Sequence, residues 1–532
     1  MGHLKVFMLC CMMMVVFPVP CHGSKILMYP LDAGYNSRLM NMFKLGRMLI
    51  KANHQITFVV SDRMKEDALF KLAEGGKVDS NLNVISYKTP PVDPTVMHVS
   101  TENQDFLEAL IIRDFAQTLN LFGQALSIAL NSTLQDKTVI DQLNAQQFDL
   151  IIADEFSLYP RVIAAERNIP IILYCNFGPM SSDSDIIPRY SLAYVNANFN
   201  RFSDVMTFLQ RLENVWDYLK IQWEMSGIYT LAEAVCQEHG YGKSCDNIRG
   251  IHKTVNLVLM NRNDVTYYPA PYMPHIISSE GFFLDKPKPL DSYYTDVIKR
   301  SGRDGIIVAS FGSMFRRLAP KYRTIFAEAF SKMPQTVIWS YEGETPEGLG
   351  DNTIVSKWIP QTDLLANPAV KLLITQCGAS SLFEALNCGL PVVAIPFIGD
   401  QEYNCLKLAD RVKSAKFVKL KTITSEQLQS VMEEAINDKT YRANARKATS
   451  IYHDQPIDPR NKTLFWIEYV IRHKGAAHLR SAGENQLNFF QYYLLDIAGL
   501  VAVILFTALI SLIVILKAVI NCLLKTLKHK KD

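Results

Sequence analysis

The chain has 532 residues, of which 48% are hydrophobic and 20% charged, and its formal net charge is +3. This length exceeds one hydrophobic core, so we expect two domains of about 200 to 250 residues. The apolar content indicates a globular protein and argues against a disordered one. The small net charge, without a basic stripe interleaved with aromatic residues, argues against nucleic-acid binding.

Residues 1–23 predict a signal peptide. An apolar run, residues 6–20, follows Lys5, and the small residue Gly23 suits cleavage before Ser24. We therefore expect the rest of the chain to enter the secretory pathway.

Short apolar strands alternate with amphipathic helices in the N-terminal half. Strands are predicted at residues 25–30, 55–60, 148–153, 170–175 and 255–260, with helices at 37–51 and 161–167. This alternation predicts a doubly wound parallel sheet. Residues 178–246 interrupt it with an aromatic, mostly helical stretch.

A proline-rich segment, residues 269–289, separates the two halves. It ends in Asp285-Lys286-Pro287-Lys288-Pro289, which predicts an interdomain linker. Further strands are expected at residues 305–309, 336–341, 371–375 and 391–397. We therefore predict an N-terminal domain at residues 24–284 and a second doubly wound domain at residues 285–480.

The C-terminal end predicts a membrane anchor. Residues 497–516 are apolar and uncharged, so a transmembrane helix is expected within 494–520. Five lysines follow (Lys517, Lys525, Lys528, Lys530 and Lys531), which predicts a cytoplasmic tail at 521–532 and a luminal remainder, the type I orientation. The last lysines resemble a dilysine retrieval signal of the endoplasmic reticulum, although an ordinary basic stop-transfer tail is the alternative.

The stretch from Ser356 to Gln401 is the richest in chemical signals. A polar loop, residues 376–381, follows the strand at 371–375, and a helix at 381–387 ends at Gly389. The free N–H groups and the positive dipole end of such a helix favour phosphate binding beyond the strand.

The flanks of this unit carry side chains that suit a nucleoside and a sugar. Trp358 offers an indole ring that can stack on a base, and Gln361 offers an amide for the base edge. Glu384 can accept hydrogen bonds from ribose hydroxyls. Asp400 and Gln401 can bond to the hydroxyls of a sugar.

Taken in order, W-x-P-Q, T-x-C-G-x-x-S followed by Glu, and G-D-Q resemble the signature of UDP-glycosyltransferases. The resemblance extends from about Gly305 to Val501, and residues 471–480 are similar to the end of animal membrane-bound UDP-glucuronosyltransferases. It implies a GT-B fold, an α/β architecture in which two Rossmann-like domains face a cleft. The helix at about 460–473 then crosses back over the N-terminal domain.

The resemblance also implies site residues. A UDP-binding set and a sugar-binding pair follow from it: Ser313, Trp358, Gln361, Gln376, Gly378, Ser381 and Glu384, then Asp400 and Gln401. The implied donor is UDP-glucose or UDP-glucuronic acid, with no cofactor and no metal. The implied acceptor is a small lipophilic molecule, which we expect to bind within residues 178–246.

The expected catalytic base is missing. Family members use a histidine, oriented by an aspartate, to take the acceptor's proton. Asp154 matches the aspartate, but the histidine position falls on Arg38, or on Ser37 after a one-residue shift, and neither is a base at neutral pH. The remaining histidine nearby, His54, is expected to be structural.

Two further departures concern Gln376 and Glu280. Most relatives carry a histidine near the phosphates where this chain has Gln376. Glu280 stands before Gly281, where relatives usually have two glycines.

Three hypotheses stay open. The first is a working transferase whose acceptor is an amine, or whose base is Asp154 acting directly or through water. The second is a catalytically impaired member that binds UDP-sugar or pairs with active relatives, which a salt bridge between Arg38 and Asp154 supports. The third is a different register, in which Tyr35 or a remote side chain supplies the function.

Other signals are local. Cys236 and Cys245, in a polar loop, are the one pair expected to form a disulfide. Asn131 and Asn461 begin glycosylation sequons. No His/Cys spacing suggests a metal site. Assembly into a homo-oligomer, or a hetero-oligomer with relatives, stays open.

Overall fold

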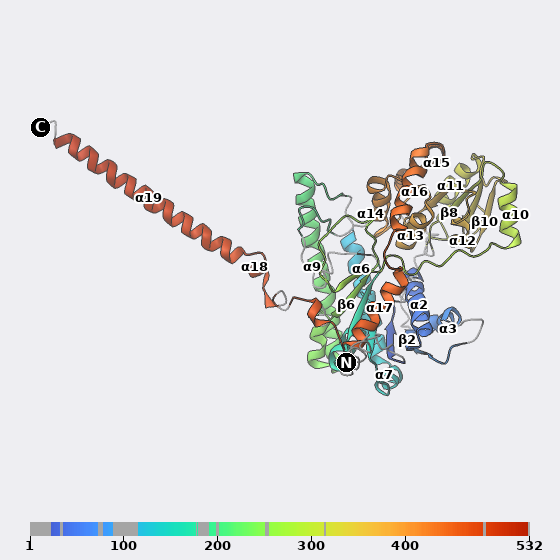
Figure 1. Cartoon of the computed structure of the whole chain (residues 1–532), viewed down its shortest axis with the longest axis horizontal. Helices are drawn as coiled ribbons and strands as arrows, with labels where there is room; N and C mark the ends of the chain where they lie inside the picture. Colours follow the sequence, from blue (N-terminus) through green and yellow to red (C-terminus); the bar gives the residue numbers. More distant parts are fainter. Residues whose placement is uncertain are drawn as a thin grey trace, which may run out of the picture. The chain divides into compact units, whose positions relative to one another are not determined.

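The structure is a computed structural model that describes residues 23–31, 36–72, 78–88, 115–176, 178, 191–197, 202–250, 255–312, 315–481, 483 and 486–529 (Figure 1). The predicted signal peptide, apart from Gly23, lies outside the described residues, as do Tyr35 and Ser313. The chain forms two compact units, residues 1–477 and 478–532.

Seven parallel strands form the first sheet, in the order β3-β2-β1-β4-β5-β6-β7. Their bounds are β1 Lys25–Tyr29, β2 Gln55–Ser61, β3 Leu82–Tyr87, β4 Leu150–Asp154, β5 Ile171–Cys175, β6 Val255–Met260 and β7 Ile276–Ser278. The register pairs Ile26 with both Ile56 and Leu150, so the chain reverses its winding direction between β1 and β4. Ligands bind beyond the carboxyl ends of the strands at such a point.

Each predicted strand of this half is present within two residues of its expected bounds. β3 and β7, which are the two edge strands, were not predicted from the sequence. β3 alternates with exposed positions and β7 has only three residues, so neither carries a strong apolar run.

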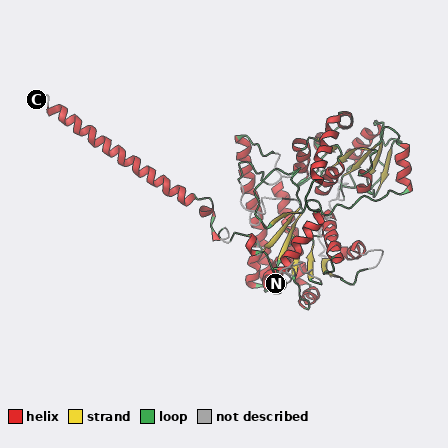
Figure 2. Ribbon diagram, in the orientation of Figure 1, coloured by secondary structure: helices red, strands yellow, loops and turns green. Residues whose placement is uncertain are grey.

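Helices enclose the strands of this half, as Figure 2 shows. They are α2 Asn36–Lys51, α3 Lys65–Leu72, α6 Phe115–Gln135, α7 Lys137–Asn144, α8 Tyr159–Glu166 and α9 Phe208–Glu238, with the 3-10 turns η1 Asp62–Met64 and η3 Gly242–Asn247. A capping box starts α9, because Thr207 and Gln210 each bond to the other's backbone N–H. α9 packs along α6.

The second sheet has six parallel strands in the order β10-β9-β8-β11-β12-β13. Their bounds are β8 Ile306–Ser310, β9 Thr336–Ser340, β10 Thr353–Ser356, β11 Val370–Thr375, β12 Val392–Ala394 and β13 Ala415–Phe417. The switch of winding direction lies between β8 and β11. Both sheets are therefore doubly wound, as predicted.

The helices of this half are α10 Ser292–Arg300, α11 Pro320–Ser331, α12 Gln361–Leu365, α13 Ala379–Cys388, α14 Gln401–Leu406, α15 Ser425–Asn437 and α16 Lys439–His453, with the π-turn η5 Lys407–Arg411 and the 3-10 turn η6 Leu420–Thr422. Aromatic rings fill the core between β9 and α11, where Trp339 packs edge-on against Phe326 and Phe330. The expected linker at 285–289 lies between β7 and β8, and the domain boundary at 284/285 stays a prediction.

Helix α17 (Pro459–Arg472) returns from the second half to the first, as expected. It contacts α2 and β6. Arg460 Nε donates to the carbonyl oxygen of Phe282 over 2.9 Å, and Lys462 pairs with Glu280 over 2.7 Å. Glu280 has a φ of 50°, a left-handed conformation that favours glycine, which accounts for the expectation of glycine there.

The disulfide between Cys236 and Cys245 is confirmed. It joins the end of α9 to η3, and both cysteines are buried. This bridge fastens the end of the longest helix of the first half.

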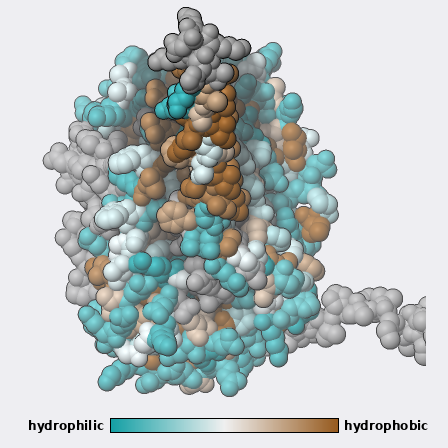
Figure 3. Space-filling view, turned by 90° about the vertical axis from the view of Figure 1, so that its left-hand side faces the viewer, coloured by the Kyte–Doolittle hydropathy of each residue, from teal (hydrophilic) through white to brown (hydrophobic). Residues whose placement is uncertain are grey.

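The second unit contains η7 Ala477–Leu479 at its start, then α18 Phe489–Tyr492 and α19 Leu495–His529. Residues 495–525 of α19 are long enough to cross a bilayer, and their most apolar stretch of 18 residues has a mean hydropathy of 3.0. Hydrophobic side chains cover α19, and Figure 3 shows them as an upright brown band. The predicted membrane helix is thus present and extends into the expected tail.

Candidate active site

The N-terminus of α13 forms the floor of the expected phosphate site. β11 ends at Thr375, the chain turns through Cys377 in a left-handed conformation (φ 62°), and α13 begins after Gly378. Among the residues that the structure describes, no side chain caps this end of the helix. The first N–H groups of α13, with the positive end of its dipole, are therefore available to an anion. Ser381 lies buried in this first turn.

Gln376 lies between this loop and the loop after β8. Its side chain is buried, and its Oε1 accepts a hydrogen bond from Thr375 Oγ1 over 2.9 Å. A Cβ atom added at Gly312 would lie 2.2 Å from Gln376 Nε2, and Gly312 has a φ of 72°. A larger residue at position 312 would therefore be strained in its backbone and would displace the Gln376 amide.

Gln361 and Glu384, both predicted to bind UDP, bond to each other. Gln361 Nε2 donates to Glu384 Oε2 over 2.6 Å, and Thr362 Oγ1 donates to Glu384 Oε1 over 2.7 Å. Burial raises the pKa of Glu384, although these two donors oppose the shift. The two hydrogen bonds hold the Glu384 carboxylate in place on α13. Its oxygens have further lone pairs that can accept hydrogen bonds from other donors.

Trp358 lies on the loop between β10 and α12. Its indole is 71% exposed, and the hydroxyl of Ser356 donates to the Trp358 carbonyl over 2.7 Å. A largely exposed ring whose backbone is held by a hydrogen bond suits stacking.

Asp400 and Gln401 lie at the start of α14, and both are buried. Gln401 Oε1 accepts from the N–H groups of Phe397 and Ile398, so its amide nitrogen is the group that can serve a sugar hydroxyl. Asn404 was missed by the sequence analysis. Its Nδ2 donates to Asp400 Oδ2 over 2.7 Å and to the Cys377 carbonyl over 3.0 Å, joining the sugar pair to the phosphate loop.

Lys407 lies one turn beyond Asn404, in the π-turn η5, where it meets the first half of the chain. Its Nζ is 3.3 Å from the ring centroid of Tyr267 and 4.7 Å from that of Tyr403. Burial lowers the pKa of Lys407 well below its usual value, against the attraction of Asp400. Burial also raises the pKa of Asp400 to about 6, against the opposing effects of Lys407, Asn404 and Arg38.

Arg38 binds Asp154 at the carboxyl edge of the first sheet. Its Nε donates to Asp154 Oδ2 over 2.9 Å, and its Nη2 donates to Asp154 Oδ1 over 2.7 Å. Nη2 also pairs with Glu155 Oε1 over 2.6 Å. All three side chains are buried, so the group forms a closed ionic cluster.

The charges of this cluster stabilise one another. Burial by itself would lower the pKa of Arg38. The attraction of the carboxylates of Asp154 and Glu155 outweighs burial and holds this pKa above its usual value. Burial raises the pKa of Glu155, against the effect of Arg38. Arg38 therefore stays protonated at all physiological pH values and cannot act as a base.

Two more groups complete the description of the predicted residues. His54 lies buried at the other end of α2, and its Nε2 is 3.7 Å from Glu468 Oε1, so it is remote from Arg38 along the helix. The sequon residue Asn461 is exposed at the start of α17, whereas Asn131 is half-buried and bonds to His239 over 2.8 Å.

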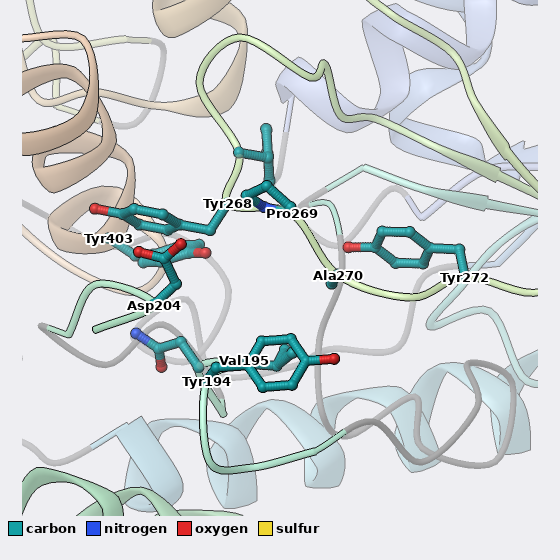
Figure 4. Close-up of a pocket in the computed structure, with 10 residues that line it drawn as sticks. Tyr194, Val195, Asp204, Tyr268, Pro269, Ala270, Tyr272 and Tyr403 are labelled. Carbon is teal, nitrogen blue, oxygen red and sulfur yellow. The ribbon is translucent and has the colours of Figure 1, made fainter. Parts of the chain in front are cut away.

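A tyrosine-lined pocket opens beside α14 (Figure 4). Tyr194, Asp204, Tyr268 and Tyr272 come from the first half of the chain, whereas Tyr403 belongs to the second. Tyr194 and Asp204 fall inside the stretch 178–246 where the sequence analysis expected an acceptor. Tyr268, Tyr272 and Tyr403 were not expected, because residues so far apart in the sequence give no common signal.

The site brings together the N-terminus of α13, the exposed indole of Trp358 and a set of buried carboxylate and amide side chains in a doubly wound domain. The profile of the family described as "UDP-glucoronosyl and UDP-glucosyl transferase" matches residues 24–531. This chain belongs to the UDP-glycosyltransferase family.

Animal glucuronosyltransferases are among the most similar relatives of this family member. Human UDP-glucuronosyltransferase 1A1 is 29% identical over 506 residues, covering 93% of this chain and 92% of the relative. Human UDP-glucuronosyltransferase 1A3 is 31% identical over 502 residues, with coverage of 92% and 90%. The family assignment therefore extends over both sheets.

Solved glycosyltransferases have the same fold. The glycotransferase of kitacinnamycin superposes with a TM-score of 0.55 at 15% identity, covering 84% of this chain and 99% of that one. A UDP-glucosyltransferase from Polygonum tinctorium, described as capable of glucosylating indoxyl and as a complex with 3,4-dichloroaniline, gives 0.57 at 14% identity, with coverage of 85% and 99%. The GT-B fold expected from the sequence is confirmed.

Proposed function

We propose that this protein transfers a hexosyl or glucuronosyl group from a UDP-sugar to a small lipophilic acceptor whose attacking atom is nucleophilic without the help of a base, such as the nitrogen of an aromatic amine. Configuration inverts at the anomeric carbon. The observation that carries the proposal is the cluster of Arg38 with Asp154 and Glu155 at the position where the family has its base.

A hydroxyl acceptor must lose its proton as it attacks, and a positioned base contributes about 10²- to 10⁴-fold to that step. Arg38 offers no such base. Both oxygens of Asp154 accept hydrogen bonds from Arg38, so the geometry disfavours Asp154 as a direct base. A neutral amine needs none: its nitrogen lone pair forms the bond to the anomeric carbon, the bond to UDP breaks with its electron pair, and the surplus proton passes to water.

For the donor, we propose UDP-glucose or UDP-glucuronic acid, bound without a cofactor. The diphosphate accepts hydrogen bonds from the N-terminus of α13 near Gly378 and from Gln376, with Ser313 and Ser381 beside it. The base stacks on Trp358 and pairs with Gln361, while Glu384 accepts from the ribose. Asp400 and Gln401 hold the sugar hydroxyls. The exposure of Trp358 and the fixed carboxylate of Glu384 support this arrangement.

We assign the acceptor to the tyrosine-lined pocket. Its rings offer apolar faces and its hydroxyls offer a few polar contacts, but its volume is about 20 Å³, so its walls must move apart to admit an aromatic amine. Tyr403 lies three residues from Asp400, which links this pocket to the proposed sugar site. The amine named for the plant structure, 3,4-dichloroaniline, is of the expected size and chemistry.

A second candidate function follows from the same cluster. A family member without a base can bind UDP-sugar without transferring it, or can act through active relatives as a partner. The salt bridge between Arg38 and Asp154 favours this alternative, because it closes the base position.

One experiment separates the two candidates. Membranes containing the full chain receive each UDP-sugar with an aromatic amine or the matching phenol, and products are measured by mass spectrometry. Product from the amine alone supports the proposal. Product from neither acceptor, with UDP binding retained, supports the impaired member. A phenol product from the unaltered chain would contradict both, whereas phenol activity gained in Arg38→His would identify position 38 as the silenced base.

We further propose a type I protein of the endoplasmic reticulum membrane, with the site in the lumen. The apolar helix α19 and the lysines after it support this orientation. The expected result is a shift in mobility on removal of high-mannose glycans that is smaller in Asn461→Gln and lost in Asn131→Gln/Asn461→Gln. An unglycosylated chain that is cleaved by protease on the cytoplasmic side would contradict it.

A further inference from the structure

Helix α9 exposes large hydrophobic side chains along one face. Six of them are between 54% and 80% exposed: Phe208, Leu209, Leu212, Trp216, Leu219 and Trp223. At 3.6 residues per turn their positions fall on a single side of the helix, over a length of about 22 Å. We call these six residues the α9 face.

The opposite side of α9 is already used by the fold. Ile221, Met225 and Ile228 are buried there, and α6 packs along the helix. A helix that is apolar on its outward side as well has more hydrophobic surface than the fold needs. Contiguous exposed apolar surface of this kind marks a contact with a protein or a membrane.

The composition of the α9 face favours a lipid surface. It contains no charged residue, and the charges beside it are of both signs, for example Arg211, Glu213, Lys220 and Glu224. It includes Trp216 and Trp223, and tryptophan is enriched where membranes meet water. A partner that binds through charged groups therefore has few charged side chains to contact on the α9 face.

A short connection joins the first unit to the apolar helix α19. Seventeen residues separate the first unit, which ends at Ala477, from the start of α19 at Leu495. Even fully extended, they span at most about 60 Å. Once α19 crosses a membrane, the first unit is held near that surface at a high effective concentration.

We propose that the α9 face docks on the surface of the bilayer that α19 crosses. The six side chains insert among the headgroups and the upper acyl chains, to a depth of about 5 to 10 Å. Apolar insertion rather than charge drives the contact, so it depends little on salt. The inference does not rest on the proposed sugar transfer.

Docking has a consequence for the tyrosine-lined pocket. Asn214, on the buried side of α9, donates to the carbonyl oxygens of Leu192 and Val195 and accepts from the N–H of Ala197. Val195 lines the pocket, as does Asp204, which precedes α9. A membrane-bound α9 thus holds part of the pocket wall near the lipids in which apolar molecules dissolve.

Tryptophan emission tests the proposal on the full chain. The chain has five tryptophans, at positions 216, 223, 339, 358 and 466, so α19 has none. In phosphatidylcholine vesicles with brominated acyl chains, we expect bromine to quench the emission. The quenched fraction should fall at least twofold in Trp216→Phe/Trp223→Phe and should not fall in Trp358→Phe, which removes an emitter outside the α9 face.

A second variant disturbs the contact and keeps the reporters. Leu212→Glu/Leu219→Glu alters two exposed positions, so we expect the unfolding temperature to stay the same and the quenching to fall at least twofold. Equal quenching in this variant and the unaltered chain, or no quenching in either, would overturn the proposal. If a second copy of the chain covers the α9 face instead, quenching is absent. Leu212→Cys then forms a disulfide-linked dimer, and the yield of this dimer falls when the chain is diluted in the vesicles before oxidation.

Discussion

Arg38 donates hydrogen bonds to both carboxylate oxygens of Asp154, although 116 residues separate them in the sequence. The pair lies at the carboxyl ends of β1 and β4, where the winding direction of the first sheet changes. Glu155 also forms an ion pair with Arg38. Arg38 and Asp154 are the residues at the positions where the family resemblance implies a catalytic histidine and its aspartate. In this chain they form a buried ionic cluster with Glu155. We expect this cluster to affect both the acceptor chemistry and the stability of the first half.

Removing the cation from this cluster should destabilise the fold. Arg38→Met leaves two carboxylates buried without their partner, which costs about 3 to 5 kcal/mol. Denaturant unfolding, followed by far-UV circular dichroism of the whole chain, measures the loss. Arg38→Met/Asp154→Asn/Glu155→Gln removes all three charges and should recover at least half of it. A loss below about 1 kcal/mol in Arg38→Met would contradict the ionic account.

Trp358 should contribute to UDP binding by stacking. Trp358→Ala is expected to weaken the affinity for UDP by about 1 to 3 kcal/mol, because base stacking on an aromatic side chain has this magnitude. Titration calorimetry of the detergent-solubilised chain provides the measurement. Trp223→Ala removes a comparably exposed indole from α9 and should leave the affinity unchanged. Equal affinities in both variants would remove Trp358 from the site.

Gly312 and Gly399 form a matched pair for testing the phosphate loop. Both have positive φ values, 72° and 62°, but a Cβ at Gly312 meets Gln376 whereas nothing lies within 4 Å of one at Gly399. Alanine should cost about 1 to 3 kcal/mol of stability at each position through backbone strain. Gly312→Ala should also displace Gln376 and weaken UDP binding at least tenfold. Similar UDP affinities in the two variants would show that Gln376 does not contact the donor.

Asp400 should make donor binding pH-dependent. Burial raises its pKa from 3.8 to about 6, so the carboxylate that accepts from sugar hydroxyls is lost as the pH falls through 6. We expect the affinity for UDP-sugar, relative to that for UDP, to fall between pH 7 and pH 5. Asp400→Asn should bind UDP-sugar with little change across this range. A wild-type ratio that is constant with pH would exclude Asp400 from the sugar site.

The same shift has a definite sign for stability. Because the folded protein holds the proton more tightly than the unfolded chain, the contribution of Asp400 is fully present below pH 3.8 and is lost as the pH rises through about 6. Asp400→Asn should therefore stabilise the protein more at pH 7 than at pH 5. Thermal unfolding at the two pH values measures the difference, and a larger gain at pH 5 would contradict the assignment.

The sequence by itself determined the local features. Apolar runs predicted the inner strands of both sheets, because fully buried parallel strands need such runs. The helix α13, its end at the left-handed Gly389, the disulfide of Cys236 with Cys245, and the apolar length of α19 are likewise set within short segments. Each of these features depends on residues that are close together in the sequence, so it can be predicted without the tertiary structure.

Only the tertiary structure decided which distant residues share a site. Arg38 meets Asp154 because β4 pairs with β1, and no local pattern encodes that pairing. Glu155 and Asn404 were missed although each lies within a few residues of a predicted one, because backbone geometry determines where their side chains point. Burial, which raises the pKa of Asp400, is likewise a property of the packed chain and not of its sequence neighbours.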